Sequence, residues 1–146
     1  MTHPVQVLEG ARSDLLQTIR RLDTLHHLRA KASQALTRND VVACAATLAV
    51  LAQIGGKLFA FEVPANPCDV ARWHVVVERI YCALEESTKH ANGMLARLNT
   101  HLANPRPSDP AWVSDVARTV VLQERHLRQQ QFAASIHADS AEAMSP

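Results

Sequence analysis

The chain has 146 residues and a mass of 16.1 kDa, the size of one domain, so a second independent core is not expected. Hydrophobic residues make up 47% of the sequence, yet only 4% are aromatic and only 4 residues are glycine, a balance that argues against a small all-β domain. The formal net charge of +1 and the pI near 7.9 lack the basic excess of a typical nucleic-acid-binding domain.

A first long helix is predicted from Glu9 to Thr37, because apolar residues recur there at helical spacing. Ser13 and Asp14 are candidate capping residues for its start. A break follows, in which Asn39 tolerates left-handed backbone geometry and Asp40 suits the cap of the next helix. The apolar stripe of this first helix consists of Leu15, Ile19, Leu22, Leu25, Ala32 and Leu36.

The second predicted helix, Val41 to Gly56, contains no charged residue. Asp40 and Lys57 limit the uncharged run to 16 residues, which is shorter than the roughly 20 that a membrane-spanning helix needs. A helix that is apolar all round is enclosed by its neighbours or by a partner. We therefore expect this helix to be the centre of the bundle or the surface that dimerises, and we expect no membrane insertion.

Prolines separate two further helices. The third is predicted from Pro67 to about Ala103, with an apolar stripe along its length, and the fourth from Ala111 to about His137. The fold class is therefore all-α: a four-helix antiparallel bundle with long first and third helices. We predict a single domain over residues 1–138 and a disordered tail over residues 139–146.

Neither a metal nor an organic cofactor is predicted. The 8 histidines include no pair four positions apart, the spacing at which two imidazoles on one helix chelate a metal ion. Cys44, Cys68 and Cys82 include no Cys-x-x-Cys spacing, and Cys44 lies in an apolar run, as a buried inert thiol would. The start of the chain lacks the pattern of a secretory signal, which favours a cytoplasmic protein with reduced thiols. No Gly-rich phosphate loop or nucleophile elbow occurs, so we predict that the chain is not an enzyme.

Two loose patterns in the first helix suggest alternatives. Arg21 and His26 form an Arg-x4-His pattern that is similar to the one in helical HEPN-type ribonucleases, which implies RNA cleavage by this pair. His26 also opens a stretch that is similar to the phosphoacceptor helix of a histidine phosphotransfer domain, with Ala30 in place of that family's glycine. An ordinary amphipathic helix surface accounts for the same residues, and the first helix has no aromatic residue for stacking on nucleic-acid bases.

The third helix carries a more extended likeness. The stretch from Trp73 to Leu95, ending in Asn92-Gly93-Met94-Leu95, resembles the signature region of flagellar export chaperones of FlgN type. The segment from Gln34 to Asp40 is similar to the hairpin that precedes the second helix in that family. The likeness covers roughly residues 10–103.

The resemblance implies a cytoplasmic chaperone that escorts a secreted hook–filament junction subunit to the flagellar export machinery. A disordered amphipathic segment of the client would add a helix to an apolar groove, so the function would be binding without turnover. The client-binding residues would be Asn92, Gly93, Met94, Leu95, Leu98 and Leu102. A plain bundle core is the alternative explanation of these side chains.

The leading functional prediction is thus a non-enzymatic helical protein-interaction module, with the export chaperone as its most specific form. Its partner would be a secreted client or a second copy of the chain, and no nucleic acid is expected. A second hypothesis is a small adaptor, immunity or regulatory protein that forms a homodimer through Val41–Phe61. A HEPN-like ribonuclease centred on Arg21 and His26 is the third.

Overall fold

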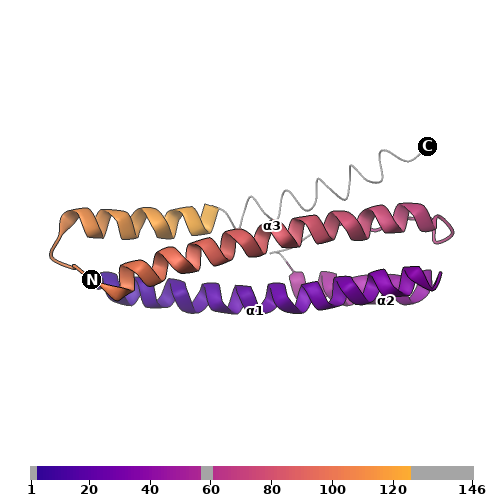
Figure 1. Cartoon of the computed structure of the whole chain (residues 1–146), viewed down its shortest axis with the longest axis horizontal. Helices are drawn as coiled ribbons and strands as arrows, with labels where there is room; N and C mark the ends of the chain where they lie inside the picture. Colours follow the sequence, from indigo (N-terminus) through magenta and orange to yellow (C-terminus); the bar gives the residue numbers. More distant parts are fainter. Residues whose placement is uncertain (1–2, 57–60, 126–146) are drawn as a thin grey trace.

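The structure, a computed structural model, describes residues 3–56 and 61–125, and within these ranges it contains four helices and no strand (Figure 1). These helices are α1 (Pro4–Thr37), α2 (Val41–Gly55), α3 (Val70–Ala103) and a helix over residues 110–125, where the described residues end. The predicted all-α fold of four helices, with the first and third the long ones, is confirmed.

The two long helices form the frame of the molecule. Figure 1 shows α1 and α3 running antiparallel along its length, with α2 and the helix over residues 110–125 at opposite ends of this pair. α1 packs against both α2 and α3. It also meets the fourth helix, because the Gln123 amide donates a hydrogen bond to the backbone oxygen of Ala11 at 3.4 Å. α1 is therefore the helix that all the others share, and the prediction that the second helix is the centre of the bundle is wrong.

α1 begins earlier than predicted. It starts at Pro4, whose fixed φ and missing N–H suit the first helical position, and the His3 imidazole accepts a hydrogen bond from the Val5 N–H at 3.2 Å. The predicted start at Glu9, with Ser13 and Asp14 as caps, is wrong: both candidate caps lie inside the helix. Buried leucines at positions 8, 15 and 22 share one seven-residue spacing, and this repeat is the signal that extends the helix toward its true start.

The turn between α1 and α2 follows its predicted chemistry. Asn39 has a φ of 56°, and the Asp40 N–H donates to the Ala35 oxygen at 2.9 Å, which closes the end of α1. The Asp40 carboxylate then accepts a hydrogen bond from the Ala43 N–H at 3.0 Å and caps α2. This hairpin places α2 back along the C-terminal half of α1.

Aspartates also cap the remaining two helices. The Asp69 carboxylate accepts from the Arg72 N–H at 3.2 Å, so α3 begins at Val70 rather than at the predicted Pro67. The Asp109 carboxylate accepts from the Ala111 N–H at 3.0 Å at the start of the last helix. The predicted end of that helix at His137 and the predicted tail over residues 139–146 lie outside the described residues.

The core is built mainly from aliphatic side chains of the two long helices. Among the described residues, the fully buried large side chains are Leu8, Leu15, Leu22, Leu25, Leu36, Leu48, Leu51, Leu84, Leu98, Val76 and Thr119. Trp112 and Val116 bring the helix over residues 110–125 into the same core. None of the helices in the described part of the chain has both the length and the hydropathy that crossing a membrane requires.

Candidate functional site

The six predicted client-binding residues lie on the second half of α3, but the structure gives them different environments. Asn92 and Gly93 are exposed. Met94, Leu95 and Leu102 are half-buried and pack against the core. Leu98 has 0% of its surface exposed, so in this conformation it stabilises the bundle and is closed to a partner.

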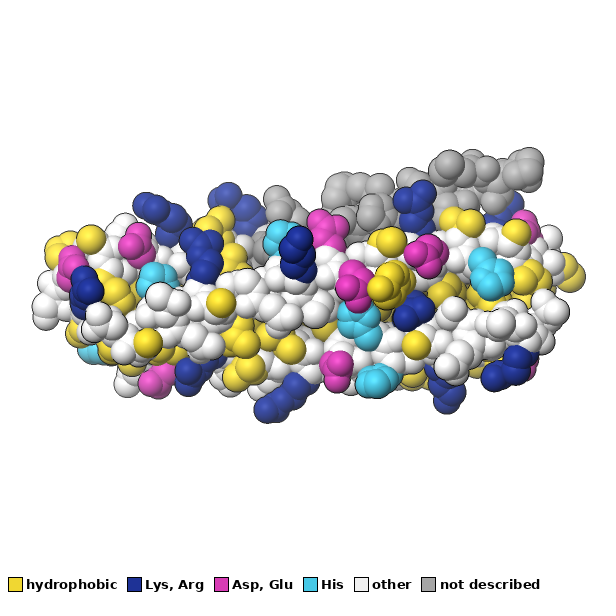
Figure 2. All heavy atoms as spheres, viewed as in Figure 1, with side chains coloured by type: hydrophobic (Ala, Val, Ile, Leu, Met, Phe, Trp, Pro, Cys, Tyr) yellow, Lys and Arg dark blue, Asp and Glu magenta, His cyan; other side chains and the backbone are white. Residues whose placement is uncertain are grey.

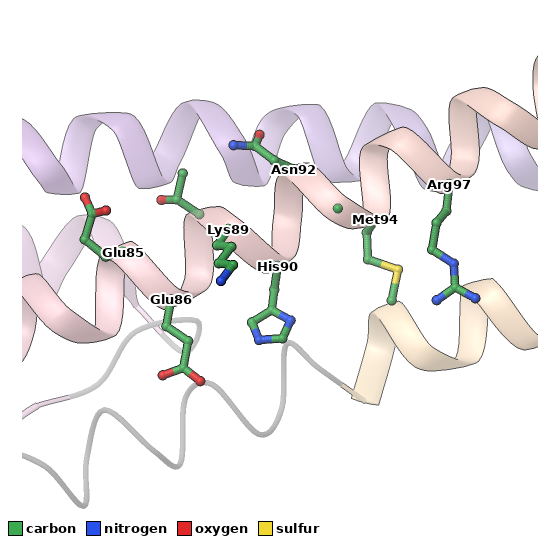
Figure 3. A pocket seen from close by; sticks show the side chains of 9 residues that line it. Glu85, Glu86, Lys89, His90, Asn92, Met94 and Arg97 are labelled. Atoms are coloured by element: carbon green, nitrogen blue, oxygen red, sulfur yellow. The ribbon is translucent and has the colours of Figure 1, made fainter.

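A hollow of about 960 Å³ brings three of these six residues together (Figure 3). Asn92, Gly93 and Met94 line it, whereas Leu95, Leu98 and Leu102 are not among its described lining residues. Figure 3 shows the Met94 and Arg97 side chains pointing toward the helix over residues 110–125, while Asn92 points away from them. Three of the six predicted residues therefore share this surface without converging on one point, and the other three do not line it.

Charged residues dominate the rest of this hollow. Its other described lining residues are Glu85, Glu86, Thr88, Lys89, His90 and Arg97. Met94 is the large apolar side chain among those described, so the surface differs from the apolar groove that the chaperone resemblance implies.

Gly93 does not have the role that its position in the motif suggests. A Cβ built on Gly93 would have nothing within 4 Å, and the described residues therefore include no element that approaches this glycine closely. Its φ is also not positive, so the backbone of α3 does not require glycine there. Close approach at Gly93 remains a prediction about a bound partner.

α2 presents a second surface, on the side that faces away from α1. Its buried residues are Cys44, Leu48, Leu51 and Gly55, which form one face. The opposite face, called here the outer face of α2, is exposed and consists of Val42, Ala46, Ala49, Val50 and Gln53, with Ile54 at its edge. Val42 is 79% exposed and Val50 is 45% exposed.

No charged residue interrupts the outer face, because the whole of Val41–Gly55 is uncharged. Elsewhere the surface is different: Figure 2 shows Lys and Arg side chains interspersed with Asp and Glu side chains along the displayed face of the molecule. Single exposed apolar residues are normal on soluble proteins, whereas a contiguous exposed apolar patch is typical of interaction sites. The second of the two roles predicted for this helix, a pairing surface, is thus compatible with its placement.

The inner face of α2 holds the predicted inert thiol. Cys44 is fully buried, and burial raises the pKa of its thiol from 9.0 to about 11. A thiol with this pKa is protonated at neutral pH and is a poor nucleophile. The prediction that Cys44 is a buried thiol is confirmed, whereas Cys68 and Cys82 are exposed and free.

The structure separates the two residues of the HEPN-like pattern. Arg21 is exposed, whereas the His26 Nε2 is 3.0 Å from the Thr88 hydroxyl of α3 and its Nδ1 is 4.0 Å from a Glu85 oxygen. Five positions along a helix correspond to a rotation of about 140°, so the two side chains leave α1 on different sides. His26 makes a polar contact between α1 and α3.

Next to this contact lies Arg29, which the sequence analysis does not single out. The guanidinium carbon of Arg29 lies 4.7 Å from the centre of the Tyr81 ring, and its Nε is buried without a hydrogen-bond partner. Arg29 occupies the position that continues the seven-residue spacing of Leu8, Leu15 and Leu22. That spacing could have placed Arg29 in the interface between α1 and α3.

A second histidine links α3 to the last helix. The His101 Nε2 is 3.3 Å from the Thr119 hydroxyl, and its ring meets Trp112 edge to face with 6.5 Å between centroids. Both histidine contacts join helices, and among the described residues no group of three or more His, Cys, Asp or Glu side chains could hold a metal ion.

Comparisons with known proteins identify no relative of this chain. No protein-family model, no curated protein and no solved structure matches the chain. Function is therefore inferred from the two surfaces described above, the outer face of α2 and the hollow on α3.

Proposed function

We propose that the chain is a non-enzymatic protein-interaction module that binds its partner through the outer face of α2. The observation that carries this proposal is the exposure of Val42 and Val50 on a helix without a single charge. Burying an exposed valine stabilises a complex by about 1.5 kcal/mol or more, and several adjacent apolar residues on one face make their contributions together.

The composition of α2 supports the proposal because folding alone does not require it. Leu48 and Leu51 on the inner face already supply the contact with the rest of the bundle. The outer positions of an isolated surface helix are ordinarily polar or charged. Apolar residues at positions 42, 46, 49 and 50 therefore serve a contact outside the described fold.

The test compares two glutamate substitutions in the full chain. Val50→Glu places a charge on the outer face of α2, and Val121→Glu places the same charge on the fourth helix, where Val121 is 49% exposed against 45% for Val50. Tagged wild type and both variants are used to capture partners from the native cytosol, and each captured partner is then purified and its affinity measured. We expect the partner to bind wild type and Val121→Glu alike and Val50→Glu at least about tenfold more weakly, a loss of about 1.4 kcal/mol.

Circular dichroism and thermal unfolding of each variant show whether the fold is intact. A folded Val50→Glu variant that retains every partner of the wild type would contradict the use of this face.

A second candidate function is favoured by the hollow on α3, which brings Asn92, Gly93 and Met94 to one surface. We propose as this alternative a cytoplasmic export chaperone that binds an amphipathic segment of a secreted flagellar subunit. The mixed charges around Met94 would pair with the polar side of such a segment, and Met94 would contact its apolar side.

This alternative is tested with a labelled peptide from the terminal segment of the hook–filament junction subunit. Met94→Glu should weaken binding measured by fluorescence anisotropy, whereas Val75→Glu should not, because Val75 is exposed on the same helix but is not among the residues that line the hollow. Equal binding by both variants would contradict a client site at Met94.

A further inference from the structure

The outer face of α2 has the properties of a surface that pairs with itself. We infer that its partner is a second copy of this chain, with the two α2 helices packed antiparallel across a two-fold axis. This inference rests on the proposed function and adds the identity of the partner.

Charge is the first reason for a second copy. A two-fold axis brings each surface against itself, so any dominant charge on the surface is set against its own sign. Val41–Gly55 contains no charged residue, so self-pairing sets no like charges together. Antiparallel pairing also places the positive N-terminal end of each helix dipole beside the negative C-terminal end of the other.

The spacing of residues on the outer face is the second reason. Val42, Ala46, Ala49 and Gln53 follow alternating steps of four and three, the spacing of a seam along which two helices pack. Ala46 and Ala49 form the middle of this seam, and their small side chains allow two backbones to approach closely at the crossing point. An axis between these alanines sets Ala46 of one copy against Ala49 of the other, and Val42 against Gln53.

The aliphatic stem of Gln53 can pack against Val42 while its amide stays in water. Val50 borders the seam and covers its side. The outer face therefore meets its own copy without leaving a charged group buried.

A lipid surface is the less suitable occupant. Helices that bind membrane surfaces carry Lys or Arg on the polar side, next to the apolar face. α2 carries neither, and its other side is packed against α1. The chemistry of α2 thus matches an apolar protein surface better than a bilayer interface.

The length of α2 sets the expected strength of this dimer. A helix of 15 residues is about 22 Å long, so a contact made by α2 alone falls toward the small end of specific protein interfaces. We expect a reversible dimer whose fraction rises with protein concentration.

Light scattering and sedimentation velocity on the full chain over a concentration series give the first test. The wild type should approach twice the monomer mass of 16.1 kDa as concentration rises. Val121→Glu should behave as the wild type does, and Val50→Glu should stay monomeric while keeping its helical circular dichroism signal. A wild type that stays monomeric throughout, or a Val50→Glu variant that still dimerises, would overturn the inference.

Cysteine cross-linking tests the antiparallel arrangement. The exposed Cys68 and Cys82 are first replaced by serine, and Cys44 is protected by burial. Val42→Cys and Gln53→Cys chains, mixed, should form a disulfide with each other, whereas Val42→Cys alone should not, since the two copies of position 42 would be about 16 Å apart along the helix axis. Efficient self-linking of Val42→Cys would indicate parallel helices and overturn this arrangement.

The two proposals fail in different ways. A monomeric wild type that binds another protein, with binding lost in Val50→Glu, would overturn the second copy as partner and leave the proposed function of α2 intact. A monomeric wild type with no α2-dependent partner would overturn both.

Discussion

α2 and the second half of α3 both contain side chains that the sequence marks as partner contacts. The two helices differ in how many of these side chains the bundle itself buries. The hydrophobic residues predicted on α3 are divided between the core and a surface crowded with charge, and Leu98 is fully buried. α2 has apolar residues on both faces, and its inner face alone packs on the bundle. A hydrophobic stripe on an amphipathic helix is thus explained by folding, whereas an apolar residue on the far side of a helix needs a further explanation.

The comparison predicts that replacing two different leucines of α3 by alanine lowers the free energy of unfolding by different amounts. Leu98→Ala should lower the free energy of unfolding by about 2 to 5 kcal/mol, because it leaves a cavity in the core. The half-buried Leu95 is the matched control, and Leu95→Ala should cost clearly less. Urea denaturation measures both values. Equal costs for the two variants would mean that Leu95 is as much a part of the core as Leu98.

Alkaline pH tests the burial of the inner face of α2. Burial raises the pKa of the Cys44 thiol to about 11, so above pH 9 the unfolded chain loses this proton before the folded chain does. The contribution of Cys44 to the free energy of unfolding is therefore present below pH 9 and is lost as the pH rises. The free energy of unfolding should fall by about 1 kcal/mol between pH 8 and pH 10 for this reason. The difference in pH dependence between wild type and Cys44→Ala isolates this effect from other groups.

Thiol labelling supplies an independent readout of the same burial. In the native chain, a thiol reagent at neutral pH should react with Cys68 and Cys82, which are exposed, and reach Cys44 only after denaturant is added. Rapid native labelling of Cys44 would show that the inner face of α2 opens from α1.

The cap of α2 should have an effect of about 1 kcal/mol. Asp40→Ala removes the carboxylate that accepts the Ala43 N–H, and we expect the free energy of unfolding to fall by about that amount. Asp40→Asn keeps a capping oxygen and should recover most of the loss in the same denaturation experiment. A similar loss in both variants would assign the effect to charge instead of capping.

The positions of the helices could largely be predicted from the sequence because prolines and capping aspartates act locally. Asp40 caps the second helix as predicted, and α3 ends at Ala103, the predicted end of the third helix. The predicted start of α1 at Glu9 is too late, because an apolar stripe that begins at Leu15 leaves out Leu8, which belongs to the same repeat.

The orientation of α2 could not be predicted in the same way. A helix without charge offers no polar side, so its sequence shows that it is apolar but not which face meets α1. Polar contacts inside the bundle could not be predicted for a related reason. Whether Arg29 lies in solvent or over the Tyr81 ring depends on which helix packs beside it. For the candidate site, the chaperone resemblance implies client contacts from Asn92 to Leu102, with a plain bundle core as the alternative, and only the fold shows that Leu98 belongs to the core.

The smallest effect on folding is expected at Val42, where the distinction between the two faces of α2 is sharpest. Val42 is 79% exposed, so at low protein concentration Val42→Lys should change the free energy of unfolding by no more than about 0.5 kcal/mol. The same substitution should weaken self-association at least about tenfold, because it replaces the apolar contact with the stem of Gln53 of the other copy by a charged side chain. A substitution that leaves folding unchanged and weakens association separates a contact surface from a core position. A loss of more than about 1 kcal/mol would instead indicate that Val42 is covered within its own chain, since exposed positions rarely have effects of that size.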